Sequence, residues 1–349
     1  AYLDWSCVVD PEGQIRRPSI LMSKNWMTSV WSWDHCFNAV ALSFRQPALA
    51  WDQLMTLFDH QDDQGALPDS ISNAKAVWSF RKPPIHGWAL LRMIRNGAVD
   101  RAKMEEIYSP LGRWTDWWFR YRDFDCDGIP QYLHGNDSGW DNSTVFRAGP
   151  AVESPDLPVF LVLQMDALAT VAAALGRGTE AEAWTRRSED LVARFLAHSR
   201  RGDRLAALLP GTHEEVPNRS LLSLMPLLLG PRLPGAVRRA LLATLERERF
   251  LSEWGLATES PDSPAYEADG YWRGPIWAPA TLLMVDGLRA SGEAGLARTV
   301  AERFARMVER SGFAENYNAL AGEGLRDRAY TWSASVFLTL AHEYLCDPA

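Results

Sequence analysis

Two acidic residues stand in loops whose composition could support chemistry. Asp141 lies in GNDSGWDNST and Glu315 lies in AENYNALAGEG, and each loop is followed by an apolar segment with helical spacing. A carboxyl group in a polar loop rimmed by aromatic residues can face a sugar ring and pass a proton to a glycosidic oxygen. The pair therefore predicts a glycosidase.

Asp141 is the expected general acid. Trp140, its neighbour, would exclude water, raise the pKa of the carboxyl group and keep a proton available near neutral pH. A role as a helix cap or turn residue would also explain an aspartate here, and Asp137 in the same loop is an equally charged rival. Gly139 and Trp140 favour Asp141, because they indicate a shaped pocket.

Glu315 is the expected general base, which would remove a proton from the attacking water. A solvated loop glutamate is the simpler explanation, and Glu323 in the same loop is the main competitor. If the carboxyl groups of Asp141 and Glu315 lie roughly 6.5 to 9.5 Å apart, water fits between them and the anomeric configuration is inverted.

The elements that must position these residues are helical. Apolar residues recur with a period near 3.6 from about residue 32 onwards, whereas period-2 strand patterns are nearly absent after the first thirty residues. Segments that are apolar on all sides alternate with segments striped by Arg and Glu. The apolar segments span about 32–45, 83–96, 156–176, 216–229, 274–292 and 330–346, and the striped ones about 47–60, 100–122, 179–200, 235–250 and 293–311.

This alternation predicts an all-α fold, an (α/α)6 barrel with six inner helices whose first outer helix would have to precede residue 32. We expect one catalytic domain over residues 1–349, with residues 1–30 as an irregular N-terminal segment. Long loops precede the inner helices and short ones follow them, so the long loops converge at one end. Loops on a rigid scaffold commonly carry binding groups. The first residue is Ala, so we also expect that an N-terminal piece has been removed.

The bulk composition restricts the partners. The net charge is −8 and no basic stripe occurs, which argues against nucleic acid and an anionic membrane as partners. The longest apolar stretches, such as residues 221–230, look too short to span a bilayer. Four cysteines without a CxxC spacing indicate neither zinc nor a disulfide framework, and reduced thiols are typical of the cytoplasm. They are Cys7, Cys36, Cys126 and Cys346.

Four ordered motifs, WSWDHCFN, GWDNS, YWRGPIW and AENYN, resemble glycoside hydrolase family 63, whose relatives include the α,α-trehalases and the glucosyl- and mannosylglycerate hydrolases. The resemblance implies an (α/α)6 barrel that hydrolyses a small α-glucoside or α-mannoside with inversion, and it assigns the acid to Asp141 and the base to Glu315. The reaction that the resemblance implies needs no cofactor and no metal. The residues expected to hold the terminal sugar are Trp33, Asp34, Tyr271, Trp272, Arg273 and Trp277.

The residue types agree with these roles. Trp272 and Trp277 offer flat faces to a pyranose ring, and Arg273 can donate a forked pair of hydrogen bonds. In a glycosylglycerate, an arginine at the mouth such as Arg147 would pair with the carboxylate of the aglycone. Lys82 and His86 in RKPPIHGW are weaker candidates for sugar contact.

Three alternatives remain open at this point. Asp123, Asp125 and Asp127 begin a calcium-loop pattern that fails at its twelfth position, so a turn rich in aspartate is favoured over an ion. An epimerase or cyclase on the same barrel would need histidines in the pocket, from His35, His86, His134 and His213, or a second acidic cluster besides HQDDQ. A carbohydrate-binding barrel without catalysis would keep the aromatic platforms alone.

Overall fold

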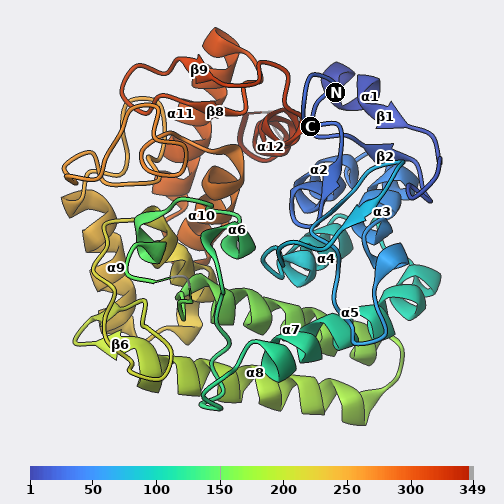
Figure 1. Ribbon diagram of the computed structural model, residues 1–349, viewed down its shortest axis with the longest axis horizontal. Helices are drawn as coiled ribbons and strands as arrows, with labels where there is room; N and C mark the ends of the chain where they lie inside the picture. Colours follow the sequence, from blue (N-terminus) through green and yellow to red (C-terminus); the bar gives the residue numbers. More distant parts are fainter. Residues whose placement is uncertain (150, 346–349) are drawn as a thin grey trace.

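The computed structural model describes residues 1–149 and 151–345 of the chain. Cys346, the last residue of the final expected helix, lies outside this described part. Helices run around a ring, and α1 near the N-terminus lies beside α12 (Figure 1).

Six inner elements form a closed ring. Consecutive members contact each other, and the last, α12, packs against the first, α2. The expected (α/α)6 barrel is therefore confirmed. The inner elements are α2 (Asp34–Leu42), α4 (His86–Arg95), α7 (Asp156–Ala174), η3 (Leu221–Arg232), α10 (Ala278–Ala290) and α12 (Thr331–Leu340).

The outer helices cover this ring, and α1, a five-residue helix at Tyr2–Ser6, packs against α12. Within the described residues, α1 is the one helix before α2. The sequence pattern likewise showed no full-length helix before residue 32. The outer helices are α3 (Pro47–Met55), α5 (Arg101–Tyr121), α8 (Gly178–Ser199), α9 (Gly235–Arg247) and α11 (Ala294–Ser311).

Burial explains the two kinds of helix. In α10 nearly every side chain is buried, because neighbouring inner elements contact it on two sides and α11 covers a third. In α11 only one stripe is buried, which includes Ala297, Val300, Ala301 and Phe304, while Arg and Glu side chains face solvent. Hydrophobic burial thus fixes which face of each outer helix meets the ring.

The fourth inner element differs from expectation. The apolar run predicted an α-helix over 216–229, but η3 is a 3₁₀ helix that begins at Leu221 and is kinked at Gly230. Pro226 and Pro231 lack the backbone N–H that an α-helix needs. Gly230 has a φ of +52°, and a Cβ there would lie 2.5 Å from the carbonyl oxygen of Ala290 on α10. A glycine is required for this close approach.

Short strands and single turns complete the chain. The N-terminal residues are less irregular than expected, since β1 pairs with β2 after α1. The strands, each of two residues, are β1 (Val8–Val9), β2 (Ser19–Ile20), β3 (Val30–Trp31), β4 (Ser70–Ile71), β5 (Ala76–Val77), β6 (Arg200–Arg201), β7 (Arg204–Leu205), β8 (Asn316–Tyr317) and β9 (Gly324–Leu325). The short helical turns are η1 (Phe58–His60), α6 (Gly135–Ser138), η2 (Thr144–Phe146) and η4 (Ala341–Leu345).

One expectation about apolar length was wrong. Helix α7 is long and apolar enough to cross a membrane, with a mean hydropathy of 1.8. Within the protein, however, 67% of that window is buried. Its apolar composition is explained by its place in the inner ring, where α4, α5, α8 and η3 pack against it.

Candidate active site

A small cavity of about 50 Å³ opens at the end of the ring where the inner helices begin. Five loops that precede α2, α4, α7, α10 and α12 contribute to it, so segments far apart in the sequence converge as expected. Both expected catalytic carboxyl groups line this one cavity. Its lining residues are Met27, Trp31, Trp33, Asp34, Lys82, Gly139, Asp141, Tyr271, Trp272, Glu315, Tyr330 and Trp332.

The acid loop, residues 133–146, is held by the carboxylate of Asp137. This group accepts hydrogen bonds from the backbone N–H groups of Leu133 at 2.9 Å and Arg81 at 2.8 Å, and it is buried away from the cavity. Gly139 adopts a φ of +74°, and a Cβ there would lie 2.5 Å from the Trp33 ring. Asp137 therefore has a structural position, and Asp141 is the carboxyl group that this loop presents to the cavity.

The Asp141 side chain keeps a quarter of its surface open to the cavity, at 27% exposure. Burial raises the pKa of Asp141, and the charge of Lys82 and the hydroxyl of Tyr271 oppose the rise. Lys82 Nζ lies 3.9 Å from Asp141 Oδ1 and 3.8 Å from Asp69 Oδ1. It also donates a hydrogen bond of 2.7 Å to the Asn136 carbonyl. Lys82 thus has a more central position than the sequence indicated.

Asn142 joins the acid loop to the segment before α10. Its side-chain N–H₂ donates to the Gly270 carbonyl at 3.0 Å, and its Oδ1 accepts from the Trp272 N–H at 2.9 Å. Tyr271, between these two anchors, has a φ of +64°, which is uncommon for a residue with a side chain. The clamp holds Tyr271 at the cavity wall, and sequence analysis had not singled out Asn142 for this role.

Glu315 lines the same cavity from the segment just before the β8–β9 hairpin. Its N–H donates to the Asp327 carbonyl at 2.7 Å, and its own carbonyl accepts from Trp332 Nε1 at 3.1 Å. Burial raises the pKa of Glu315 to about 7, and the negative charge of Asp141 contributes to the rise. The titrations of the two carboxyl groups are therefore coupled. Glu323, the rival, is exposed and does not line the cavity.

Asp34 is the third acidic group of the cavity. It is the first residue of α2, is 4% exposed, and burial raises its pKa to about 8 despite the nearby charge of Lys82. A carboxyl group that is protonated near neutral pH can donate as well as accept hydrogen bonds. Sugar hydroxyls need both kinds of partner, so Asp34 is chemically suited to hold one.

Indole rings form one wall of the cavity. Trp33 and Trp272 line it directly, and Trp277 stacks behind Trp272 with ring centroids 4.0 Å apart and planes 7° from parallel. Trp140 also lies behind, with its ring centroid 4.8 Å from that of Trp272. Trp140 and Trp277 are buried and do not reach the cavity, so they fix the orientation of the rings that do.

The two expected arginines lie elsewhere. Arg273 pairs with Glu267 at 2.8 Å, and Arg147 is exposed near Glu259, whose pKa its charge lowers. Neither lines the cavity. Arg326, just after β9, is not a lining residue either, but its guanidinium lies 4.9 Å from the ring centroid of Tyr271, which is one, and its charge lowers the pKa of Glu315. Sequence analysis also missed the lining residues Met27, Trp31, Tyr330 and Trp332; only their place in aromatic-rich loops marked them.

No histidine of the described residues lines the cavity. His35 and His86 are buried in the ring, and burial lowers the pKa of both imidazoles. His134 stacks on Phe80. The arrangement lacks the facing pocket histidines that an epimerase of the kind considered above would use.

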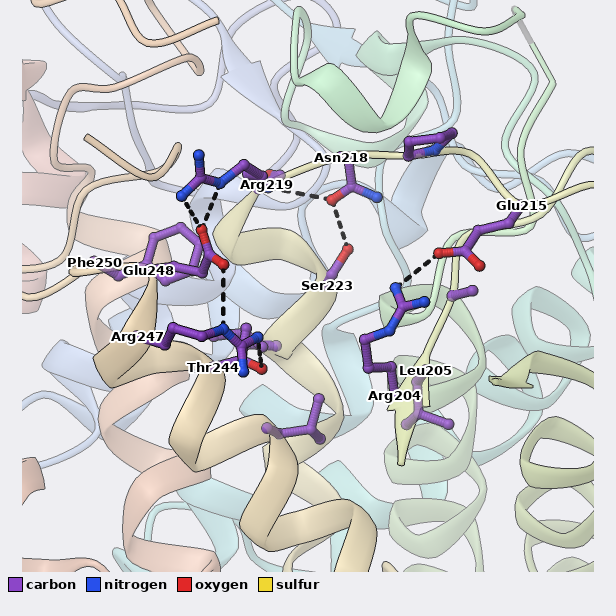
Figure 2. A pocket seen from close by; sticks show the side chains of 15 residues that line it. Arg204, Leu205, Glu215, Asn218, Arg219, Ser223, Thr244, Arg247, Glu248 and Phe250 are labelled. Carbon is purple, nitrogen blue, oxygen red and sulfur yellow. Dashed lines mark hydrogen bonds and ion pairs between the residues drawn. The ribbon is translucent and has the colours of Figure 1, made fainter. Parts of the chain in front are cut away.

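A second, polar pocket lies between β7, η3 and α9 (Figure 2). Its arginines are already paired, with Arg204 2.8 Å from Glu215 and both Arg219 and Arg247 beside Glu248. It shares no lining residue with the cavity described above. None of the predicted catalytic or sugar-binding residues lies in it.

Residues 27–333 match the family model of the mannosylglycerate hydrolase MGH1-like glycoside hydrolase domain. The chain belongs to this family. A mannosylglycerate hydrolase from Rubrobacter radiotolerans is 26% identical, with 90% of each chain covered. A glucosylglycerate hydrolase from Mycolicibacterium hassiacum is 24% identical, covering 88% of this chain and 91% of the relative. Membership makes the protein a glycoside hydrolase, as the motifs predicted, and overturns the alternative of a barrel without catalysis.

Solved structures support the same fold. A family 63 mannosylglycerate hydrolase from Thermus thermophilus, determined with Tris and D-glycerate, superposes with a TM-score of 0.84 at 21% identity, covering 97% of this chain and 98% of that one. A neutral trehalase from Saccharomyces cerevisiae gives 0.72 at 13% identity, covering 93% and 73%. These neighbours show the fold; the expected resemblance to family 63 is confirmed by the family model together with the relatives above, while the role of each residue stays a prediction.

Proposed function

We propose that this glycoside hydrolase cleaves a small α-linked glucoside or mannoside of the glycosylglycerate type with inversion of configuration. The observation that carries the proposal is the convergence of Asp141 and Glu315 on one aromatic-walled cavity. In the reaction Asp141 donates a proton to the leaving oxygen, and Glu315 takes a proton from the water that attacks the anomeric carbon. Free sugar and the protonated aglycone are the products.

The remaining cavity residues have binding roles in this proposal. Trp33 and Trp272 pack against the C–H face of the terminal sugar, and Asp34 hydrogen-bonds its hydroxyl groups. Lys82 keeps Asp141 from becoming too weak an acid, because its positive charge opposes the rise in the pKa of Asp141. The small volume suits a single terminal sugar, so cleavage is from the end of the substrate.

An acidic aglycone needs a cation near the leaving group. The names of the relatives point to glycerate, and the position of Arg326 beside Tyr271 suits a carboxylate better than that of Arg147 does. Arg326 pairs with Asp269 at 2.9 Å, but that aspartate is 63% exposed, so a substrate carboxylate competes easily for the guanidinium. We therefore assign the aglycone carboxylate to Arg326.

The proposal is tested by incubating the enzyme with mannosylglycerate, glucosylglycerate and neutral α-glucosides while NMR follows the released anomer. We expect the β-anomer first, with glycerate glycosides preferred. Release of the α-anomer would contradict the carboxylate roles. Arg326→Ala should lower the ratio of kcat/KM for glycerate glycosides to kcat/KM for neutral glycosides at least tenfold. The matched variant Arg147→Ala should leave this ratio unchanged. The reverse pattern would return the role to Arg147.

A further inference from the structure

A second cluster of titratable side chains lies outside the cavity, where the loop after α5 meets the end of α8. Asp127, Glu153, His198 and His213 each offer one ligand atom, and these atoms all lie within 4.8 Å of one another. None of the four lines the cavity, and the proposed hydrolysis uses none of them. Three separate parts of the chain therefore bring imidazoles and carboxylates together without a catalytic reason.

The spacing of three atoms suits one metal ion. Asp127 Oδ2 lies 3.2 Å from His198 Nδ1 and 3.5 Å from His213 Nε2. Tetrahedral zinc with bonds of about 2.1 Å separates its ligand atoms by about 3.4 Å. Asp125 Oδ2 lies 3.1 Å from the same nitrogen of His213 but also accepts a hydrogen bond of 2.7 Å from the Gly211 N–H, so a water molecule is the better fourth ligand.

Glu153 has the position of an outer partner. It is 1% exposed, and its Oε2 lies 2.7 Å from His198 Nε2. An N–H at Nε2 that donates to this carboxylate leaves the lone pair of Nδ1 directed toward Asp127. Metal-binding histidines are commonly oriented by a carboxylate in this way.

Buried carboxylate oxygens in the cluster remain unpaired. Asp127 Oδ2, Glu153 Oε1 and Asp123 Oδ1 have no hydrogen-bond partner among the described residues. The adjacent Arg194 and Arg201 donate to the backbone carbonyls of Asp127 and His213, not to the carboxylates. The two imidazoles can compensate the carboxylates only when they are protonated, and a divalent cation would compensate the charge when they are neutral.

We propose that Asp127, His198 and His213 bind a divalent transition metal of the zinc class, with Glu153 orienting His198. Two imidazoles favour such a metal over calcium, which prefers oxygen ligands alone. The expected aspartate-rich turn is present, since Asp123 and Asp127 accept hydrogen bonds from the N–H groups of Gly128 and Ile129, and in this proposal Asp127 is also a metal ligand. The ion would tie the loop after α5 to the end of α8, independently of the proposed substrate.

The test uses the full chain without a histidine tag, treated with EDTA and titrated with ZnCl₂ by calorimetry. One zinc ion should bind per chain, and saturating zinc should raise Tm by roughly 3 to 5 °C. His213→Asn should weaken binding at least 100-fold, since asparagine tolerates the φ of +53° found there. His342→Asn, an exposed histidine outside the cluster, is the matched control and should bind like the wild type.

Glu153→Gln should weaken zinc binding about 10- to 100-fold, as expected when an orienting carboxylate is lost. The melting temperature of each variant in EDTA shows whether it still folds, so a loss of binding can be separated from a loss of structure. Unchanged zinc affinity in His213→Asn would overturn the proposal. A Tm rise produced by CaCl₂ and not by ZnCl₂ would also overturn it.

Discussion

The cavity and the polar pocket of Figure 2 are both lined by charged side chains, but their charges are used differently. In the polar pocket Arg204, Arg219 and Arg247 each pair with a glutamate. In the cavity Asp141 lies 3.9 Å from Lys82, whereas within the described residues Glu315 and Asp34 form no ion pair, and burial raises the pKa of both. Paired charges hold a surface together, whereas unpaired buried carboxyl groups are available to bind and exchange protons.

The sharpest test of this comparison removes the catalytic carboxyl groups. Asp141→Asn and Glu315→Gln should each lower kcat by at least ~10³-fold, because proton transfer is lost while shape is kept. Turnover is measured on a glycosylglycerate, and circular dichroism checks the fold. Either variant with more than a tenth of wild-type turnover would show that its residue is misassigned.

Breaking the clamp between the acid loop and the α10 segment should have the next largest effect. Asn142→Ala frees Gly270 and the Trp272 N–H, so Tyr271 loses its fixed position. We expect kcat/KM to fall about 10- to 100-fold, because a shift of about 1 Å in a substrate-positioning group can cost this much. Asn218→Ala in the polar pocket is the matched control, and equal losses in both variants would refute the special role of the clamp.

Asp34 should lower the stability of the folded protein at neutral and higher pH while contributing to substrate binding. Its pKa is about 8 in the folded protein and 3.8 ordinarily, so its contribution to stability is present at low pH and is lost as the pH rises toward 8. Asp34→Asn should therefore raise the free energy of unfolding by about 1 to 3 kcal/mol at pH 8 and by little at pH 4. Urea denaturation at both pH values measures this, and KM should rise. A loss of stability at pH 8 would contradict the assignment.

Coupling between the two catalytic groups gives a smaller effect. The Asp141 anion raises the pKa of Glu315, so Asp141→Asn should bring that pKa below about 7. Carbon-13 NMR of the glutamate carboxyl groups follows the titration, and Glu315→Gln identifies the signal. In the wild type, kcat/KM should rise as Glu315 ionises near pH 7 and should fall as Asp141 loses the proton that it donates. A Glu315 signal unmoved by the Asp141 substitution would mean that the groups do not interact.

The smallest effect is expected in the polar pocket. Arg204→Ala removes an exposed pair with Glu215, which should cost no more than about 1 kcal/mol of stability. Activity should stay within about twofold of wild type. A larger loss of activity would show that this pocket takes part in the reaction and would end the contrast with the cavity.

The fold could be predicted because the spacing of apolar residues along a helix shows which faces are buried. Segments that are apolar on all sides indicated the inner ring. Residues next to helix starts, such as Trp33 and Asp34, could be placed for the same reason. Arg147 and Arg273 could not, because the direction of a loop side chain depends on distant partners such as Glu259 and Glu267.

Two further differences have local physical causes. The helical spacing of the run before residue 230 did not reveal its 3₁₀ geometry, which follows from Pro226, Pro231 and the contact of Gly230 with α10. The clamp by Asn142 was also hidden, since its partners lie 128 and 130 residues away in the sequence.

The contact between α2 and α12 closes the ring, so it also determines when the barrel can finish folding. Ser335 on α12 donates a hydrogen bond to Asn38 on α2, so the seam joins the earliest and latest parts of the barrel. During synthesis on the ribosome, the early helices must wait for their final partner, with apolar faces exposed in the meantime. A permuted chain with linked termini that opens at the β6–β7 turn would synthesise α12 shortly before α2, with the N-terminal segment between them.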